Sequence, residues 1–337
     1  MNLRFLVPVV YALSSIAAAQ TVAPVNAPRN GGDFSSNASG SKVPTGVILV
    51  KGAWSSASDS TTPVPEGGTM RNNLYANDYF GISYPMPVGW TEIYEGPPPS
   101  ESGRYVLAQL SPTETTKGTR GIVLITAQDM FFNPQPAANA LELVTYSRDH
   151  LQADYKVEIP PSTTKVADHP FTFFAYWSPV AQLHWYVLAT EIRCHAVEIV
   201  LSSQDTKLLE HLVVDMDHMN LPAEANPSAG TGGGQFPVCI KDYATDENLI
   251  TRVDPVFAQR RFNPVPVRII IDKTGSVKHI HLLSAFPDQA KVVTDALRQW
   301  KFKPYMQGGK PVEVETGILF GSPQFPARLK SSASAVE

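Results

Sequence analysis

The sequence predicts an α+β protein of two domains, an N-terminal antiparallel sheet with packed helices followed by a smaller C-terminal domain. Three observations lead to this class. The 337 residues, 43% hydrophobic and 17% charged, have the composition of a globular protein and suffice for about two domains of ordinary size. Short alternating apolar runs outnumber helical patterns. The charge is uneven, because residues 1–236 carry 13 basic and 21 acidic side chains while residues 237–337 carry 14 and 10.

The composition also excludes several classes of protein. Wholesale disorder, a collagen-like chain and a polytopic membrane protein do not fit it. Neither half of the chain is basic enough to predict a nucleic-acid partner. After the N-terminus, no apolar run approaches 18 uninterrupted residues, so we expect no stable membrane span in the mature chain.

Residues 1–19 are typical of a cleavable secretory signal. Arg4 supplies a positive charge, residues 5–16 are apolar, and three alanines precede Gln20. The alternative is an uncleaved anchor in the inner membrane, but a helix over residues 5–19 would be about 22 Å long against roughly 30 Å of hydrocarbon. We therefore expect export to the periplasm and a mature chain that begins near Gln20.

Residues 71–221 are expected to form the first domain. Apolar periodicity predicts one helix over residues 136–151 and a closing helix over residues 205–219. Runs rich in Val, Ile, Phe, Tyr and Trp predict strands at residues 79–84, 104–110, 121–127, 154–159, 171–177, 184–190 and 196–202. The preceding residues 20–70 are rich in Pro, Ser and Gly and are expected to be a linker, with one short apolar island at residues 47–50.

Residues 237–325 are expected to form the second domain, between a Gly-rich linker at residues 222–236 and a tail at residues 326–337. Its predicted elements are a half-buried strand at 265–271, a turn with Gly275 at positive φ, a returning strand at 277–283, a helix with Val293, Leu297 and Trp300 on one face, and a last strand at 312–320.

The chain has two cysteines, Cys194 and Cys239, one in each predicted domain. In an oxidising compartment they could form a disulfide that joins the domains. The alternative is a small buried apolar side chain at Cys194 and a free thiol beside the linker at Cys239. Neither cysteine has the spacing of a zinc or redox motif.

The second domain resembles the C-terminal domain of the TonB family. The resemblance rests on Val-Arg-Ile-Ile-Ile-Asp-Lys-Thr-Gly-Ser-Val at 267–277, Ala-Leu-Arg-Gln-Trp-Lys-Phe-Lys-Pro at 296–304 and Gly-Lys-Pro-Val at 309–312. It implies a small αββαβ domain in the periplasm. It also implies a protein partner, because the last strand of the family takes up an extended segment of an outer-membrane transporter as an extra strand.

The resemblance places this partner on the strand 312–320. The implied binding residues are Val312, Glu313, Val314, Glu315, Thr316, Gly317 and Ile318. An edge strand presents unpaired N–H and C=O groups, so an extended partner gains main-chain bonds with few side-chain contacts. Full TonB transducers also carry a transmembrane anchor and a Pro/Lys-rich rod, whereas here the N-terminus looks cleavable and a folded domain follows it.

The first domain is similar to PsbP-like domains, through Phe-Gly-Ile-Ser-Tyr-Pro at 80–85 and Gly-Trp at 89–90. Such domains are mostly adaptors and assembly factors, which implies binding and not catalysis. The sequence itself contains no nucleophile elbow, P-loop, zinc-protease motif or dinucleotide fingerprint. We therefore expect that the protein is not an enzyme and needs no cofactor.

Three polar groupings could bind a ligand, but each has a simpler interpretation. His211, Asp215 and His218 share a helix face that could hold a metal, and a solvated polar face is the favoured interpretation. His279 and His281 share one strand face without a third ligand, so we expect a solvent-facing pair. At residues 300–303 we expect the two aromatic side chains to anchor the core while the two lysines face water.

We therefore expect an exported cell-envelope binding protein of a Gram-negative bacterium that engages a protein partner by β-strand addition. Energy transduction to outer-membrane transport is the narrower form of this hypothesis. The alternative is a structural or adaptor protein of the periplasm without transport coupling, in which the first domain carries the recognition.

Overall fold

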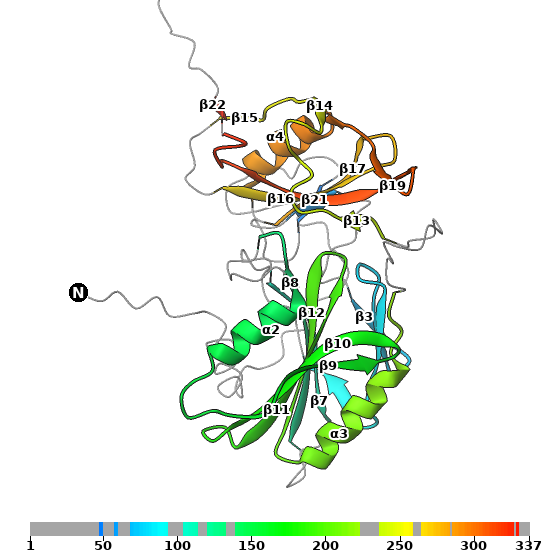
Figure 1. Ribbon diagram of the computed structural model, residues 1–337, viewed down its shortest axis with the longest axis vertical. Helices are drawn as coiled ribbons and strands as arrows, with labels where there is room; N and C mark the ends of the chain where they lie inside the picture. The colour runs from blue at the N-terminus through cyan, green and yellow to red at the C-terminus, as the bar shows by residue number, and fades with distance from the viewer. Residues whose placement is uncertain are drawn as a thin grey trace, which may run out of the picture.

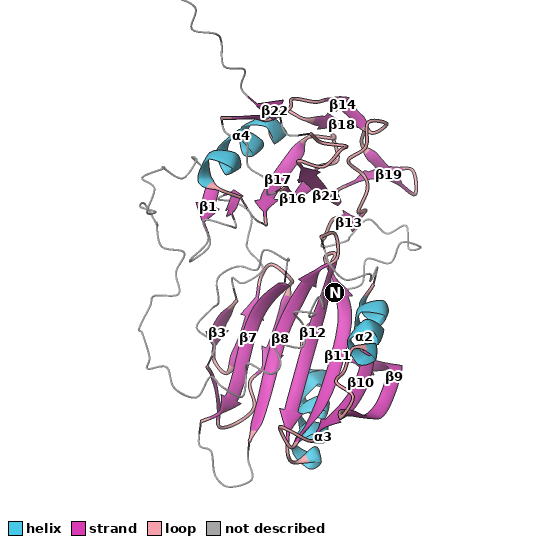
Figure 2. Cartoon of the chain, turned by 90° about the vertical axis from the view of Figure 1, so that its left-hand side faces the viewer, coloured by secondary structure: helices cyan, strands magenta, loops and turns pink. Residues whose placement is uncertain are grey.

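The computed structural model describes residues 47–49, 57–59, 68–93, 104–113, 120–132, 139–222, 236–258, 264–283, 285–326 and 328–329. The expected signal peptide, most of both expected linkers and most of the tail lie outside these residues. We call residues 68–222 the N-terminal domain and residues 236–329 the C-terminal domain. The C-terminal domain lies at one end of the long strands of the N-terminal domain (Figures 1 and 2).

The N-terminal domain is built on a seven-stranded antiparallel sheet in the order β6-β7-β8-β12-β11-β10-β9. Its strands are β6 (Trp90–Glu92), β7 (Arg104–Pro112), β8 (Gly121–Asp129), β9 (Lys156–Val166), β10 (His169–Ser178), β11 (Leu183–Ile192) and β12 (His195–Ser203). A second sheet packs beside it and contains β3 (Thr69–Arg71), β4 (Leu74–Asn77) and β5 (Ile82–Pro85). The expected antiparallel sheet is therefore present.

One helix covers each face of the seven-stranded sheet, as Figure 1 shows. Helix α2 (Ala140–Asp149) packs on the face that includes Ala196 and Val200 of β12. Helix α3 (Thr206–Asp215), continued by the 3₁₀ turn η2 (Met216–His218), packs on the opposite face of β12. Successive side chains of a strand point to opposite faces, so β12 is buried on both.

The C-terminal domain is a smaller, sheet-rich unit, and its described residues contain one helix, α4 (Pro287–Leu297). Its strands are β13 (Val238–Cys239), β14 (Leu249–Thr251), β15 (Val256–Phe257), β16 (Val265–Ile271), β17 (Val277–Leu282), β18 (Lys301–Phe302), β19 (Tyr305–Gln307), β20 (Lys310–Val312), β21 (Val314–Phe320) and β22 (Arg328–Leu329). The implied αββαβ order is wrong at its start, because residues 236–258 hold short strands and no helix.

The core of the C-terminal domain lies between α4 and the sheet. Trp300 is 2% exposed, and its Nε1 donates a hydrogen bond of 2.7 Å to the carbonyl of Val253. Phe302 is fully buried, while Lys301 is partly exposed and Lys303 is exposed. The expectation for these four residues is therefore confirmed. Gly275 has the expected positive φ of 87°, and a Cβ there would clash with the carbonyl of Phe302.

Two short strands from the expected linker join the C-terminal sheet. β1 (Val47–Leu49) and β2 (Ala57–Asp59) form an antiparallel pair, and β2 pairs with β17. The resulting sheet has six strands in the order β1-β2-β17-β16-β21-β13. Part of the expected linker therefore lies on the C-terminal sheet, because an exposed strand edge offers main-chain groups to an extended segment.

Candidate partner-binding site

The strand expected to take up a partner, β21, does not have a free edge in this structure. It lies between β16, with which it pairs antiparallel, and β13, with which it pairs parallel. In the parallel pair, Val238 is opposite Val314 and Cys239 is opposite Glu315. The expectation of an uncovered edge is therefore wrong, because the chain that enters the C-terminal domain supplies a strand of its own.

We call residues 238–243 the covering segment. The main-chain N–H of Val238 donates to the carbonyl of Glu313 at 2.8 Å, and the N–H of Ile240 donates to the carbonyl of Glu315 at 3.0 Å. The N–H of Gly317 donates to the carbonyl of Lys241 at 3.5 Å. These bonds use the outward main-chain groups of β21, which an added partner strand would also need.

The side chain of Thr316 fixes the far end of the covering segment. Its hydroxyl donates to the carbonyl of Lys241 at 2.9 Å and accepts from the N–H of Tyr243 at 3.2 Å. The ring of Tyr243 is 6% exposed in the domain core, and its hydroxyl donates to the carbonyl of Lys303 at 2.6 Å. Tyr243 is therefore an anchor point, whereas Cys239 and Lys241 are exposed.

The expected binding residues separate into groups with different roles. Val312 belongs to β20, and Val314 and Ile318 are buried in the core of the C-terminal domain. The main-chain N–H and C=O groups of successive strand residues point to opposite sides of the strand. Those of Ile318 face β16, opposite Val267, and cannot bond to a partner on the other side. Glu313 pairs through its carboxylate with Lys278 at 2.9 Å.

The remaining two expected residues, Glu315 and Gly317, face the N-terminal domain. Gly317 has a physical reason to lack a side chain, because a Cβ there would lie 2.9 Å from the Phe132 ring and 3.1 Å from Cβ of Phe131. The two phenylalanines follow β8 and approach the sheet closely at this point. Glycine therefore permits contact between the domains here.

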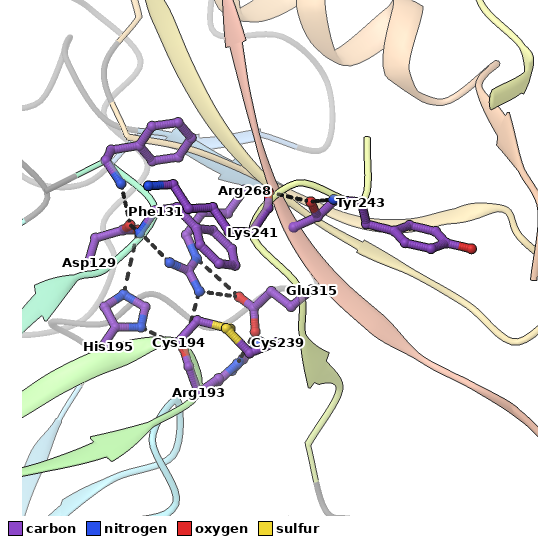
Figure 3. Close-up of a disulfide and its surroundings, with 12 residues drawn as sticks. Asp129, Phe131, Arg193, Cys194, His195, Cys239, Lys241, Tyr243, Arg268 and Glu315 are labelled. Atoms are coloured by element: carbon purple, nitrogen blue, oxygen red, sulfur yellow. Dashed lines mark hydrogen bonds and ion pairs between the residues drawn. A yellow bond between two sulfur atoms is a disulfide. The ribbon is translucent and has the colours of Figure 1, made fainter. Parts of the chain in front are cut away.

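A disulfide between Cys194 and Cys239 joins the two domains. Cys194 lies in the two-residue turn between β11 and β12, where Ile192 pairs with His195 and both turn residues have positive φ, 51° for Arg193 and 59° for Cys194. Such a turn suits the twist of a β-hairpin, although non-glycine residues adopt it at some cost. Figure 3 shows the disulfide beside Arg268 and Glu315.

Arg268 forms the centre of a buried ion network next to this disulfide. It projects from β16, and its side chain is 1% exposed. Its Nη1 donates to Asp129 at the end of β8 at 2.5 Å, and its Nε and Nη2 donate to Glu315 at 3.1 and 3.0 Å. Nη2 also donates to the carbonyl of Arg193 at 3.1 Å. Arg268 therefore bonds the C-terminal domain to Asp129 and to the carbonyl of Arg193 in the N-terminal domain.

Arg193 completes the charge balance of the network. Its Nε donates to Glu315 at 3.4 Å, and its Nη1 donates to the carbonyl of Tyr79 at 2.9 Å. Its guanidinium carbon lies 3.9 Å from the centre of the Tyr79 ring. Two guanidinium groups thus face two carboxylates, Asp129 and Glu315. Burial alone lowers the pKa of Arg268, but the two carboxylates outweigh this effect and raise that pKa.

Two buried histidines adjoin the network in their neutral form. Burial, followed by the positive charges of Arg268 and Arg193, lowers the pKa of His281 to about 3. Burial and Arg268 also lower the pKa of His195. The expectation that His281 faces solvent is wrong, because this residue is 3% exposed and lines a small cavity with Tyr79, Arg193 and Arg268.

The other candidate ligands are not assembled into a site. The side chain of His211 is 74% exposed, and its Nε2 lies 3.9 Å from Asp215. Across the part of the chain that the structure describes, no group of three or more His, Cys, Asp or Glu residues is arranged to hold a metal ion. None of the described helices has the length and apolar character needed to cross a bilayer.

The sequence did not identify Arg268, Asp129 or Arg193 as functional residues. One signal was present, since an arginine in the middle of an otherwise apolar strand must reach solvent or a buried carboxylate. The second face of β16 was expected to be exposed, yet all seven of its residues are buried. The contact that buries this face is formed by residues more than 70 positions away, which strand periodicity does not report.

Comparison with known proteins finds a match for part of the C-terminal domain. Residues 258–321 match the family model described as Gram-negative bacterial TonB protein C-terminal. The TonB C-terminal match includes β16, β17, α4 and β21, so it contains both Arg268 and the strand that binds the covering segment. The covering segment itself lies before the matched residues.

One solved structure with similarity to part of the chain is the solution structure of cyanobacterial PsbP (CyanoP) from Synechocystis sp. PCC 6803. The TM-score is 0.31 and the sequence identity is 16%, and the similarity covers 44% of this chain and 91% of that chain. A search of curated proteins found no match.

Proposed function

We propose that this protein is a binding protein of the Gram-negative cell envelope that takes an extended segment of a protein partner as an additional strand on β21. The observation that carries the proposal is the parallel pairing of β13 with β21, because β21 lies within residues 258–321, which match the TonB C-terminal model. Because an own-chain segment binds there mainly through main-chain groups, a partner segment of similar shape has the same groups to bind.

The proposal assigns binding and not catalysis to the protein. The charged side chains at the domain junction pair with one another, because two arginines neutralise two carboxylates. Such a network stabilises an arrangement of domains and leaves no ionised group directed at a substrate. Export to the periplasm rests on residues 1–19, and coupling to outer-membrane transport is the narrower form of the proposal.

A second function, that of a structural adaptor, is favoured by a different observation. Both outer strands of the central C-terminal sheet, β17 and β21, carry a short strand from the same chain. If neither short strand dissociates from the sheet, β21 has no free edge to which a partner can bind. Recognition of a partner would then be a task of the N-terminal domain. The two functions differ in whether the main chain of β21 contacts a partner.

A proline substitution in β21 tests this difference. Leu319 is opposite Pro266 of β16, which has no N–H, and the alternation of the strand directs the main chain of Leu319 outward. Leu319→Pro therefore removes an outward donor without removing a bond to β16, and Leu319→Ala is the matched control that keeps the donor.

The measurement is the capture of envelope proteins by immobilised mature chain, with and without a thiol reductant, quantified by mass spectrometry. We expect a protein that is retained by wild type and by Leu319→Ala but lost with Leu319→Pro, while circular dichroism shows that all three are folded. Equal retention by Leu319→Pro and Leu319→Ala would favour the adaptor.

A further inference from the structure

We propose that the Cys194–Cys239 disulfide is a redox switch that controls access to β21. In the oxidised protein the disulfide holds the covering segment on the strand, and in the reduced protein the segment leaves and a partner strand can bind. The inference rests on the proposed strand addition and specifies how that site is regulated.

The covering segment and a partner strand compete for the same atoms. The covering segment occupies the carbonyls of Glu313 and Glu315 and the N–H of Gly317. A partner that adds to this edge must bond to these groups as well, since they are the ones that alternate outward. Partner binding therefore requires the covering segment to move away.

The disulfide acts where the covering segment is otherwise weakly held. β13 pairs over two residues only, and Cys239 is one of them. Val238 is partly exposed and Cys239 and Lys241 are exposed, so Ile240 supplies the apolar packing of this end against the domain core. Tyr243, by contrast, is buried and bonded to Lys303. After reduction, the segment can turn away from β21 about Tyr243 without disturbing the domain core.

The position of the two cysteines also suits an exchange with a dithiol reductant. Cys239 is exposed, whereas Cys194 is 8% exposed. A thiolate of the reductant attacks the Cys239 sulfur, the bond between the cysteines breaks, and Cys194 leaves as a thiolate that takes up a proton. The second thiol of the reductant then attacks the mixed disulfide, which releases Cys239 as a thiol. Two electrons and two protons pass to the protein, and the reductant becomes a disulfide.

Reduction leaves the domains in contact, because the ion network does not depend on the disulfide. Arg268 bonds to Asp129 of the N-terminal domain and to Glu315 of its own domain through separate nitrogens. The side chains of all three are at most 2% exposed. The switch therefore changes the occupancy of one strand edge and not the arrangement of the whole molecule.

The test uses a peptide copied from the covering segment, since this sequence pairs with β21 in the structure. The probe is fluorescein-labelled Phe-Pro-Val-Ser-Ile-Lys-Asp-Tyr, residues 236–243 with Cys239→Ser, and its binding to the mature chain is measured by fluorescence anisotropy. A tethered segment competes at a high effective concentration, which the disulfide raises further. We expect at least about tenfold tighter binding to the reduced protein and to Cys194→Ser/Cys239→Ser than to the oxidised protein.

Two control peptides identify the mode of binding. The peptide with Ile240→Pro lacks the donor to the carbonyl of Glu315 and is expected not to bind, whereas the peptide with Ile240→Ala keeps this donor and is expected to bind. Equal binding of both peptides would contradict main-chain pairing with β21.

The outcomes separate the switch from the proposed function. If the oxidised protein binds the probe as tightly as the reduced one, the switch is overturned and strand addition stands. If the reduced protein is folded and binds no probe, strand addition at β21 fails, and the switch fails with it. Should the double variant not fold, amide exchange at Val238 and Ile240 decides, since protection unchanged by reduction of the wild type would overturn the switch.

Discussion

Arg268 has the most demanding environment of any charged residue at the domain junction. Its side chain is 1% exposed, and the two carboxylates that it contacts are 0% and 2% exposed. Removal of a charge from water costs several kcal/mol, so such a group is tolerated only when its partners are complete. The bonds to Asp129 and Glu315 and to the carbonyl of Arg193 supply these partners.

Removal of the Arg268 charge should therefore cost much more than removal of an exposed one. We expect Arg268→Met to lower the free energy of unfolding by about 3–5 kcal/mol, because Asp129 and Glu315 stay buried with too little positive charge. Lys278→Met is the matched control, since Lys278 pairs with Glu313 at the surface and should lose less than about 1 kcal/mol. Urea denaturation of the oxidised chain measures the free energy of unfolding of both variants. Equal losses would contradict the burial of Arg268 away from water at the domain junction.

The buried histidines predict that acid destabilises the folded protein. His281 has a pKa of about 3 in the folded state against an ordinary value of 6.5, so the unfolded state binds more protons between these two pH values. Stability is therefore full above pH 6.5 and falls as the pH decreases toward 3, by up to about 1.4 kcal/mol per pH unit for this residue. Arg268, Arg193, Tyr79, Glu315 and His279 line the same cavity as His281, and the ring centre of Tyr105 lies 6.4 Å from that of His281.

The measurement is the free energy of unfolding at pH 6.5 and pH 5, a range above the ordinary pKa of carboxylates. We expect His281→Leu to be less sensitive to this change of pH than wild type. His211→Leu serves as the matched histidine control, because His211 lies on the exposed face of α3. An unaltered slope in His281→Leu would mean that His281 is already solvated.

At the scale of the elements, the packing of α4 on its sheet depends on one aromatic side chain. Trp300 lies three residues beyond Leu297, the last residue of α4, and contacts Phe302, Phe320 and Phe325, with ring centres 5.7–5.9 Å apart. We expect Trp300→Ala to cost about 3–5 kcal/mol, the usual effect of emptying a large aromatic site. Thermal or urea unfolding of the full chain measures this loss, with Lys303→Ala as a neutral exposed control. A loss below about 1 kcal/mol would place Trp300 outside the core.

Elements with strong local signals could be predicted from the sequence, although their ends shifted. The first helix was expected from residue 136 and begins at Ala140, because Asn139 is extended and its side chain accepts from the N–H of Glu142. β9 was expected to end at residue 159 and continues to Val166. Its two prolines, Pro160 and Pro161, are tolerated because β9 is the outermost strand.

Elements whose partners are distant in the chain could not be predicted in this way. The covering segment is too short to have a recognisable period, and its place on β21 depends on a disulfide to a turn 45 residues earlier. β2 pairs with β17 through two residue pairs across more than 200 residues of sequence. The placement of the candidate site on β21 therefore stays a prediction, and the strand that covers it and the charged junction beneath it were not foreseen.

A disulfide and an ion network join the two domains, in addition to the packing of Phe131 and Phe132 on Gly317. The disulfide joins the turn after β11 to β13, and the ion network joins the end of β8 to β16 and β21. The disulfide does not depend on the buried charges, and the ion network does not depend on the disulfide. Either tie should therefore be enough to keep the domains together.

This arrangement predicts a non-additive effect of removing both ties. We expect Cys194→Ser/Cys239→Ser to keep the radius of gyration of the oxidised wild type, because Arg268 still bonds to Asp129. Arg268→Met should also keep it, because the disulfide remains. The triple variant should let the C-terminal domain separate from the end of the seven-stranded sheet, so its radius of gyration increases and protease cleavage within residues 222–236 becomes faster.

Small-angle X-ray scattering and limited proteolysis of the four proteins measure these changes. Circular dichroism of the triple variant is the necessary control, because separation of folded domains must be distinguished from unfolding. An increase already present in the double cysteine variant would show that the ion network alone cannot hold the junction. In that case reduction would release the C-terminal domain as a whole, and the strand edge of β21 would become accessible by domain movement and not by departure of the covering segment.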